Sequence, residues 1–526
     1  MYKTEGMESN KIKYPIGEQS FVRLRKEGFL YVDKTVYIKK IVEGSKYYFL
    51  GRPRRFGKSL FLSTLKSFFK GERELFKGLY ADAMEWDWEP YPVLYLDLNT
   101  SKYKEPDELN GVLDRQLREW EEVYEVDVKD STLAQRLATI IRTACQRTGK
   151  GVVILVDEYD KPLVNNINNP EQFESYRNAL ASIYSNFKSS ADYLELVFLT
   201  GVTRFGKLSI FSDLNNLSDI SFDEDFAAVC GITEEELIDN FSDGITELSE
   251  KYNRSRNKEI AELKRNYDGY HFSEDCPDIF NPFSLLQVFA KRKYNNYWIS
   301  SGTPTILAEQ LKLTNTDLED LLHTRCSQNA LEGLDMNSPR PIALIYQTGY
   351  LTIKKYDQRR RLYHLGIPNE EVKQGFFEFL LPYYTSINEE RVTPFIFDLI
   401  DEVEEGRVDD FMKRLQSLFA GFGHDLKFDE ERNVQNAMLL IFSLVGMHAD
   451  AEVRNSDGRI DILVRTADYV YIMELKYNRT AEEALRQIEE KEYSLPWSID
   501  SRTIIEIGIN YSSEKRRIDE WMVKKK

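Results

Sequence analysis

The sequence predicts a multidomain α/β protein whose N-terminal part is a mostly parallel β-sheet with helices on both faces. Three observations predict this fold. Four short apolar runs alternate with helical stretches before residue 201, the middle of the chain is helical and acidic, and a separate helix–strand–strand–helix pattern begins at residue 434. Alternation with near-continuous apolar strands is typical of a buried parallel sheet. At 526 residues the chain is also too long for one ordinary core.

The predicted strands are rich in Val, Leu and aromatic residues and are bounded by polar or glycine-containing turns. They are Tyr47–Leu50, Val93–Leu98, Val152–Asp157 and Leu194–Thr200. Between them, apolar residues recur at helical spacing from Phe61 to Phe69, and Leu113–Tyr124 and Leu133–Cys145 are long and free of proline. These three stretches are the predicted helices around the sheet. Near Ile342–Leu365, a helix followed by two short strands is compatible with a small winged-helix-like module.

Composition places the chain among ordinary globular proteins, with 42% hydrophobic and 30% charged residues. No run approaches the roughly 20 apolar residues of a membrane helix, and residues 1–10 carry no apolar signal core, so we expect a cytoplasmic protein without a membrane partner. Four separated cysteines and five scattered histidines form no disulfide or metal pattern. The net charge of −17 argues against a surface coated for nucleic-acid binding. The basic "KRR" and "KKK" near the C-terminus are interpreted as a solvated tail.

Two stretches have the form of a phosphate-binding loop, "GRPRRFGKS" from Gly51 and "GVTRFGKLS" from Gly201. Such a loop needs a lysine for the β- and γ-phosphates and a hydroxyl for Mg²⁺ at the start of a helix. Only the first stretch supplies both, as Lys58 and Ser59, whereas the second has Leu208 after its lysine. The first has one residue more than usual between its glycines, which we interpret as a variation at the loop entry.

We therefore predict that the first loop binds the nucleotide through Arg55, Phe56, Gly57, Lys58, Ser59 and Leu60. Arg52, Pro53, Arg54 and Arg55 form its wall, and the arginines either neutralise phosphate charge or are solvated surface. The later strand ends in Asp157-Glu158, the form of a Walker B segment. There the Asp positions the metal and the Glu polarises the attacking water, so Ser59 and Asp157 are the predicted Mg²⁺ ligands and Glu158 the predicted catalytic base.

The stretches "YPIGEQSFVRLRKEGFLYVDKTVYIKKI" and "RPRRFGKSL" resemble the bacterial and archaeal AAA-ATPase-like proteins. "VDEYDKPL", "LTGVTRF", "YDGYHF" and "YHLGIPNEEV" resemble later blocks of the same family, so the resemblance spans nearly the whole chain. It implies an AAA-type P-loop core, with Thr200 or Thr203 at a sensor position that reads the γ-phosphate and Arg204 as a weaker phosphate-sensing candidate. Many AAA-type proteins form rings, so a homo-oligomer stays open.

A second chemical constellation lies in "GRIDILVRTADYVYIMELKYNRT". Asp461 opens one predicted strand, and Glu474 and Lys476 lie two apart on the returning strand, which puts them on one face of it. If the two strands pair, Asp461 and Glu474 can share a Mg²⁺ while Lys476 holds or activates a water. The same pattern also occurs as a plain surface ion pair. A helix follows, with Ala481, Ala484, Leu485 and Ile488 as its buried stripe and Gln487 on its flank.

This stretch resembles the PD-(D/E)XK nuclease superfamily, in particular the nuclease-like domain that ends the AAA-ATPase-like proteins. "GRIDILV" resembles its second motif, "YIMELK" its Glu-x-Lys motif and "EEALRQIEEKEY" the helix that carries the Gln. Upstream, "EERNVQNAMLLIFSLVG" resembles the first helix, with Glu431 at its acidic position. The resemblance implies a nuclease site formed by Glu431, Asp461, Glu474, Lys476 and Gln487.

The sequence thus predicts three parts: an AAA-like P-loop core at 12–218, a mainly helical lid or middle region at 219–385, and a nuclease-like α+β domain at 386–526. The leading functional hypothesis is a protein that binds and hydrolyses ATP with Mg²⁺ and couples it to a metal-dependent nuclease acting on nucleic acid, expected to be DNA. The alternative is a nucleotide-dependent switch whose C-terminal domain binds nucleic acid or a protein without cleaving it.

Overall fold

The computed structural model describes residues 12–127, 132–204, 216–299, 307–308, 311, 314, 316–332, 341–420, 430–448, 454–455 and 462–526. The chain divides into two compact units. Unit 1 comprises Met1–Trp298 and Thr324–Glu370, and unit 2 comprises Ile299–His323 and Glu371–Lys526. The expected domain limits at 218 and 385 stay predictions. None of the helices in the described ranges combines the length and the apolar character that crossing a membrane requires.

Unit 1 is built on a five-stranded sheet with the order β2-β3-β4-β1-β5, in which every neighbouring pair is parallel. Its strands are β1 (Tyr47–Gly51), β2 (Val93–Asp97), β3 (Val152–Asp157), β4 (Leu194–Gly201) and β5 (Ser218–Asp219). The predicted parallel α/β core is confirmed. All six residues of β3 are buried, as expected for a strand covered on both faces.

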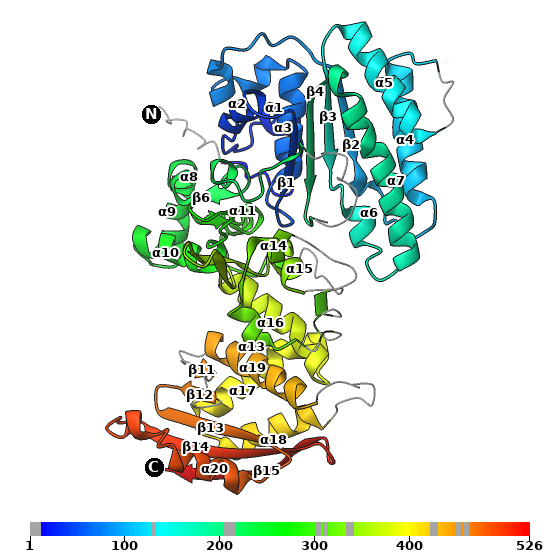
Figure 1. Cartoon of the computed structure of the whole chain (residues 1–526). Coiled ribbons are helices and arrows are strands. Elements are labelled where there is room, and N and C mark those ends of the chain that lie inside the picture. The colour runs from blue at the N-terminus through cyan, green and yellow to red at the C-terminus, as the bar shows by residue number, and fades with distance from the viewer. Residues whose placement is uncertain are drawn as a thin grey trace, which may run out of the picture. The chain divides into compact units, whose positions relative to one another are not determined.

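Helices lie on both sides of this sheet (Figure 1). On one side are α1 (Phe21–Lys26), α2 (Val36–Val42) and α3 (Lys58–Phe69), and on the other are α4 (Glu108–Val123), α5 (Leu133–Thr148) and α7 (Pro170–Ser189). Between β3 and α7 lies the short α6 (Lys161–Val164). The buried faces of α4 and α5 carry leucines and isoleucines at helical spacing, which is why these amphipathic sequences pack on the sheet.

The strand order places β4 between β1 and β3. Leu50 and Gly51 pair with Thr200 and Gly201, and Val156 pairs with Leu199. Because all three strands are parallel, their carboxyl ends meet at one edge of the sheet, where ligands of open α/β sheets bind. The loop after β1 and the acidic end of β3 therefore lie on either side of the end of β4.

The rest of unit 1 is mainly helical. Helices α8 (Glu234–Asn240), α9 (Ser242–Lys251), α10 (Arg256–Tyr267) and α11 (Pro282–Lys291) share one buried core, and β6 (Ile232–Thr233) pairs with β7 (Ile279–Phe280). A small α/β part follows: β8 (Arg325–Cys326), α14 (Gln328–Glu332), α15 (Pro341–Thr348), and the antiparallel β9 (Thr352–Asp357) and β10 (Leu362–Gly366). The helix and the two strands expected at 342–365 are present.

Unit 2 combines helices with a second sheet. Its helices are α13 (Leu318–Leu322), α16 (Glu370–Tyr384), α17 (Glu389–Glu404), α18 (Val408–Phe419), α19 (Glu430–His448) and α20 (Ala481–Glu490). The sheet order is β11-β12-β13-β14-β15, and β13 and β14 are parallel. The strands are β11 (Arg454–Asn455), β12 (Ile462–Arg465), β13 (Tyr469–Tyr477), β14 (Thr503–Ser512) and β15 (Arg517–Lys525).

The C-terminal basic residues do not form a tail, although the side chains of 524–526 are exposed to solvent. β15 pairs antiparallel with β14 up to Lys525. Lys526 donates to Ser494 Oγ at 2.8 Å and forms an ion pair with the buried Glu506. Lys524 of β15 forms an ion pair with Glu489. The strand β15 supplies backbone partners to the edge of β14, an Ile-rich strand that is buried in the sheet.

Arg52, the first residue after β1, is a structural side chain rather than part of a solvated or phosphate-facing wall. It is 1% exposed. Its guanidinium donates to Gly51 O at 2.9 Å and Ser221 O at 2.8 Å, and to the carbonyls of Phe226 and Ala227. Burial removes the guanidinium from water and thereby lowers its pKa. The four carbonyls and the Phe272 ring, whose centroid is 4.2 Å away, compensate for the lost hydration of the charge.

We predict that Arg52→Met destabilises unit 1 by about 2–4 kcal/mol, because it leaves buried carbonyls without donors. The measurement is the free energy of unfolding of unit 1, obtained from denaturant unfolding of the full chain and monitored with a spectroscopic probe in unit 1. Arg54→Met is the matched control, since Arg54 is exposed in the same loop, and its change is expected within about 0.5 kcal/mol. Equal effects of the two substitutions would contradict the structural role of Arg52.

Candidate functional site

The predicted phosphate loop runs from Arg52 to Gly57, between the end of β1 and the start of α3. Gly57 precedes the helix with φ at 100°, a value that residues with a Cβ rarely adopt. A Cβ built on Gly57 would meet nothing within 4 Å, so backbone conformation and not space requires glycine there. The loop thus leads into a helix N-terminus, whose free N–H groups favour an anion.

Three residues of the loop, Arg54, Arg55 and Phe56, contact segments outside it. Phe56 is buried edge-on against Tyr270 and Phe272, and its carbonyl accepts a bond from Gly231 N at 3.0 Å. Trp298 Nε1 donates to Arg54 O at 3.1 Å. Arg55 is exposed, and its guanidinium lies 5.0 Å from the Phe283 ring centroid. The loop is therefore shaped before any ligand binds.

Lys58 is the first residue of α3, and it is 5% exposed. Its ammonium donates to the loop carbonyls of Arg52 at 2.9 Å and Pro53 at 3.1 Å. Burial lowers its pKa, while the charges of Glu158 and Asp157 act in the opposite direction. The lysine charge is thus held between the loop and the acidic end of β3. Ser59 follows on α3 and is partly exposed.

Asp157 ends β3 and is 3% exposed. Thr200 Oγ1 on β4 donates to its Oδ1 at 2.7 Å, and Tyr95 OH on β2 contacts its Oδ2 at 3.4 Å. Two neighbouring strands therefore orient this carboxylate. Thr200, a predicted sensor, is itself fully buried, so in this structure its hydroxyl acts on Asp157.

Asp160 is a site residue that sequence reasoning missed. It is 2% exposed, and its Oδ2 accepts bonds from Thr203 N and Thr203 Oγ1, both at 2.6 Å, and from Val202 N at 3.1 Å. Burial raises its pKa, and the Thr203 bonds lower it. The sequence did contain a signal for Asp160, because it is a third acidic residue, two positions after Glu158 in "VDEYD", at the end of a predicted strand.

Glu158 lies between these two buried aspartates. It has φ at 50°, a left-handed backbone that is uncommon for a residue other than glycine and costs about 1–3 kcal/mol. The next residue, Tyr159, donates its backbone N–H to Thr200 O at 3.0 Å and its hydroxyl to Thr203 O at 2.9 Å. The turn that carries Glu158 is therefore fixed to the end of β4.

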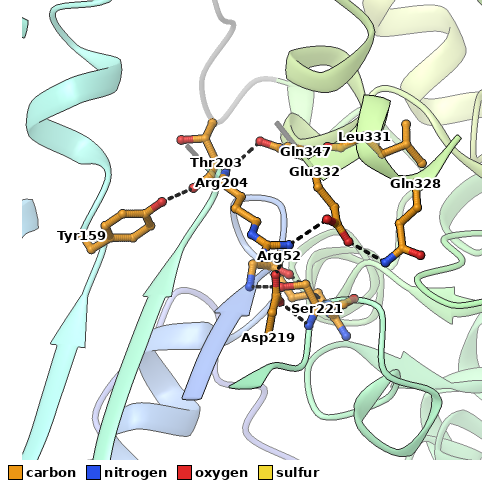
Figure 2. Close-up of polar contacts among 11 residues, drawn as sticks. Arg52, Tyr159, Thr203, Arg204, Asp219, Ser221, Gln328, Leu331, Glu332 and Gln347 are labelled. Carbon is orange, nitrogen blue, oxygen red and sulfur yellow. Dashed lines mark hydrogen bonds and ion pairs between the residues drawn. The ribbon is translucent and has the colours of Figure 1, made fainter. Parts of the chain in front are cut away.

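Arg204 does not face the loop as a free cation. Its guanidinium pairs with Asp219 at 2.6 Å and with Glu332 at 3.1 Å, and its backbone N–H donates to Gln347 Oε1 at 2.9 Å (Figure 2). Asp219 is in β5, Glu332 in α14 and Gln347 in α15. The arginine thus ties the end of β4 to the small α/β part of unit 1. Lys207 and Leu208, in the second loop candidate, lie outside the described residues.

An apolar pocket adjoins the first loop. Phe56, Gly57 and Leu60 line it, together with Tyr31, Val229 and Leu286 from the surrounding segments. Lys34 also lines it, but its ammonium is taken up by an ion pair with Glu236 at 2.6 Å and a bond to Ala228 O at 2.8 Å. A pocket with this lining favours a flat apolar group next to the phosphate loop.

In unit 2, three of the predicted residues form one cluster. Glu474 on β13 is 2% exposed, and Lys476 Nζ lies 2.9 Å from its Oε1. Lys476 also donates to Gln487 Oε1 on α20 at 2.7 Å, and Gln487 Nε2 donates to Glu474 Oε1. The carboxylate, ammonium and amide thus fix one another, as expected for side chains two apart on a strand and a helix packed on their face.

Close packing of α20 makes this cluster possible. A Cβ on Gly508 of β14 would lie 2.2 Å from Ala481 O and 2.6 Å from Leu485 N. Glycine therefore lets the helix backbone approach the sheet directly beside Glu474, with which Gly508 is paired. Ile472 and Ile488 complete the buried core between β13 and α20.

Glu431 and Asp461 are not among the described contacts of that cluster. Glu431 is exposed near the start of α19 and lines a pocket with Asp317, which caps α13, with Glu319 of α13, and with Leu475 and Tyr477. Because strand side chains alternate, Leu475 and Tyr477 face away from the side of β13 that carries Glu474. Asp461 lies outside the described residues. The first described residue of β12, Ile462, pairs with Met473, the neighbour of Glu474.

Within the described ranges, no three His, Cys, Asp or Glu side chains gather in a way that could hold a metal ion. At the loop, the available donors are the Ser59 hydroxyl and the Asp157 carboxylate. Mg²⁺ takes such a set together with substrate phosphates and waters, so these residues fit a metal that arrives with a nucleotide. In unit 2, Glu474 supplies one carboxylate, and a second ligand has to come from elsewhere.

Comparisons with known proteins match a part of unit 1 and a part of unit 2 to two different families. Residues 15–211 match the AAA-ATPase-like family, described as predicted AAA-ATPase, and residues 429–521 match the PD-(D/E)XK nuclease superfamily. The chain is 33% identical to a protein of Azotobacter chroococcum mcd 1, described as "Uncharacterized protein in vnfD 5'region". The match extends over 526 residues and covers 96% of this chain and 98% of that protein.

The chain belongs to the AAA-ATPase-like family. This AAA-ATPase-like protein ends in a domain of the PD-(D/E)XK nuclease superfamily. It also matches the solved structure of the Aeropyrum pernix ORC2 protein in its ADPNP–ADP complexes, with 10% identity and a TM-score of 0.25, over 66% of this chain and 93% of that one.

We predict that Lys58→Ala weakens ATP binding at least about 100-fold, because about 3 kcal/mol of charge-assisted bonding to phosphate has no substitute in the loop. Titration calorimetry with a slowly hydrolysed ATP analogue measures it. Lys207→Ala, in the second loop candidate, is the control and is expected to bind as wild type does. The choice of loop is wrong if Lys207→Ala loses binding and Lys58→Ala keeps it.

Proposed function

We propose that this AAA-ATPase-like protein hydrolyses ATP at the loop of unit 1 and cuts nucleic acid in a metal-dependent reaction at the Glu474 cluster of unit 2. The observation that carries the first half is the meeting of Lys58, Asp157 and Glu158 at one edge of a parallel sheet. The second half rests on the mutual bonds of Glu474, Lys476 and Gln487.

For ATP hydrolysis, the chain's residues divide into three tasks. The loop N–H groups and Lys58 bind phosphate, and Ser59 and Asp157 hold the Mg²⁺ that neutralises its charge. Glu158 follows Asp157 directly and is the group that orients and deprotonates the attacking water. Thr200 and Thr203 act through their bonds to Asp157 and Asp160, which fix the acidic turn. The apolar pocket beside Gly57 supports adenine as the base.

For the nuclease, the proposed ligands are Glu474 and Asp461, the residue directly before Ile462. Two carboxylates would bind a divalent cation, which in such sites polarises the phosphodiester and lowers the pKa of bound water. Lys476 would then stabilise the water or the charge that develops on phosphorus, and Gln487 would orient Lys476 and Glu474. Glu431 stays a proposal without a described contact to this cluster. DNA is the proposed form of the nucleic acid.

We predict that Glu158→Gln keeps ATP bound but lowers its turnover by about 100-fold or more, because the amide cannot accept the proton of the attacking water. Rapid filtration of bound nucleotide and a phosphate-release assay separate the two effects. Glu174→Gln, a half-exposed glutamate on α7, is the control. Normal turnover in Glu158→Gln would rule out Glu158 as the base.

We predict that Glu474→Gln lowers nuclease activity at least about 100-fold, the equivalent of about 3 kcal/mol of lost stabilisation of the transition state. Asp461→Asn should match it, Lys476→Ala should impair cleavage, and ATP hydrolysis should survive all three. The assay follows plasmid and single-stranded substrates with Mg²⁺ or Mn²⁺, with and without ATP. Glu506→Gln is the matched control, because Glu506 is a buried, lysine-paired glutamate of the adjacent strand β14.

The same assay decides against the alternative function. If the wild-type protein hydrolyses ATP but cuts neither single-stranded nor double-stranded nucleic acid, the alternative is favoured. The protein would then be a nucleotide-dependent switch whose C-terminal domain binds nucleic acid or a protein without cleaving it. If Asp461→Asn cuts as fast as wild type, the proposed metal ligands are wrong.

A further inference from the structure

Lys161, the first residue of α6, lies against the proposed catalytic base. Its ammonium is 3.7 Å from Oε2 of Glu158, and it donates to the side-chain oxygen of Asn99, which lies in the 3-10 turn that follows β2. Both members of the ion pair are about a quarter exposed, so their attraction is only partly screened by water.

The charges around the pair explain why a cation is needed there. The ends of β2 and β3 bring together four carboxylates, those of Asp97, Asp157, Glu158 and Asp160. Burial raises the pKa of Asp97, the charges of Asp157 and Glu158 raise it further, and the charge of Lys161 lowers it. The ammonium of Lys58 also interacts electrostatically with Asp157, Glu158 and Asp160, but its proposed partner is the phosphate of the nucleotide. Lys161 is then the cation that stays beside Glu158.

The backbone fixes where the Glu158 side chain begins but not where its carboxylate points. The turn is held by Tyr159 N to Thr200 O at 3.0 Å and by Lys161 N to Glu158 O at 3.0 Å. Beyond Cα, the described polar contact of the Glu158 side chain is the one to Lys161. A carboxylate that must reach one water needs such a partner, because misplacement by about 1 Å can lower a rate about 100-fold.

Lys161 is in turn fixed from the β2 side. Asp97 Oδ1 accepts a bond from Asn99 N at 2.8 Å, which positions the amide that receives the ammonium. Directly after α6, Asn165 Nδ2 donates to Lys102 O at 3.0 Å and Asn166 Nδ2 donates to Tyr103 O at 2.8 Å. The helix that carries Lys161 is thus tied to the same segment that carries Asn99.

We propose that Lys161, held by Asn99, is the positioning residue that aims the Glu158 carboxylate at the attacking water. This inference rests on the proposed ATP hydrolysis. Lys161 touches the base and acts through it, so removing it should slow turnover without weakening ATP binding. A phosphate-binding role for the same ammonium would have the opposite signature, because it would raise KM for ATP.

The test uses the full chain and compares wild type with Lys161→Ala, Lys161→Arg and Asn99→Ala. Steady-state ATP hydrolysis gives kcat and KM, and titration with a slowly hydrolysed analogue gives Kd. Lys188→Ala, on the exposed face of α7, is the matched control for loss of a lysine in unit 1. Thermal unfolding of each variant checks that unit 1 is folded.

We expect Lys161→Ala to lower kcat at least about 10-fold with KM and Kd within about threefold of wild type, and Lys161→Arg to recover most of the rate. Asn99→Ala should fall between them, and Lys188→Ala should match wild type. In a Glu158→Gln background, Lys161→Ala should have little further effect, because a residue that acts only through Glu158 has nothing left to position.

Three results overturn the inference: a kcat within twofold of wild type in Lys161→Ala, a raised KM at unchanged kcat, or a full additional loss of rate on the Glu158→Gln background. Each of these leaves ATP hydrolysis intact as the proposed function. A wild-type chain that binds ATP and never hydrolyses it would instead refute the proposed function, and the inference with it.

Discussion

The pairing of β4 with both β1 and β3 is the constraint on which the nucleotide site depends. It places Thr200 beside Asp157 and Thr203 beside Asp160, and it brings the loop that carries Lys58 to the same edge. Because all three strands are parallel, the basic loop and the acidic turn lie on either side of the end of β4. The two threonine hydroxyls supply donors to buried carboxylates that would otherwise cost several kcal/mol to keep away from water. The strand order therefore assembles the site and also makes its buried charge tolerable.

The charge balance at that edge explains several features together. Four carboxylates gather there, and Lys58 and Lys161 are the lysines described beside them. Arg52 and Arg204, which look in sequence like further phosphate partners, bind carbonyls and carboxylates of unit 1 instead. Arg52 and Arg204 thus stabilise the fold around the loop, and Lys58 and Lys161 remain for the proposed chemistry. In unit 2, the bonds among Glu474, Lys476 and Gln487 likewise keep a buried charge satisfied.

Much of this architecture could be predicted from local patterns. The four predicted strands are present as β1 to β4, and α3, α4 and α5 lie at the three predicted helices. Both kinds of element could be predicted because a buried strand is a short apolar run and an amphipathic helix has apolar residues at a spacing of three or four. Strand alternation predicted that Glu474 and Lys476 share one face of a strand, and the resemblance to the PD-(D/E)XK superfamily added Gln487 to their site. The contacts of Asp160 with Thr203, of Lys161 with Asn99 and of Arg52 with Ser221 could not be predicted, since each joins segments distant in the chain. The strand β15 was missed because charged edge residues look like a solvated tail.

The most direct test of the central claim, that one edge of the sheet binds a metal–nucleotide complex between Ser59 and Asp157, is electron paramagnetic resonance of Mn²⁺ bound with a slowly hydrolysed ATP analogue. The experiment uses the Glu474→Gln chain, so that Mn²⁺ at the proposed nuclease site does not contribute. The account predicts Mn²⁺ that binds only with the nucleotide, shows hyperfine coupling to its phosphorus atoms, and is lost in Asp157→Asn. Phosphorus-coupled Mn²⁺ that is unchanged in Asp157→Asn would contradict it.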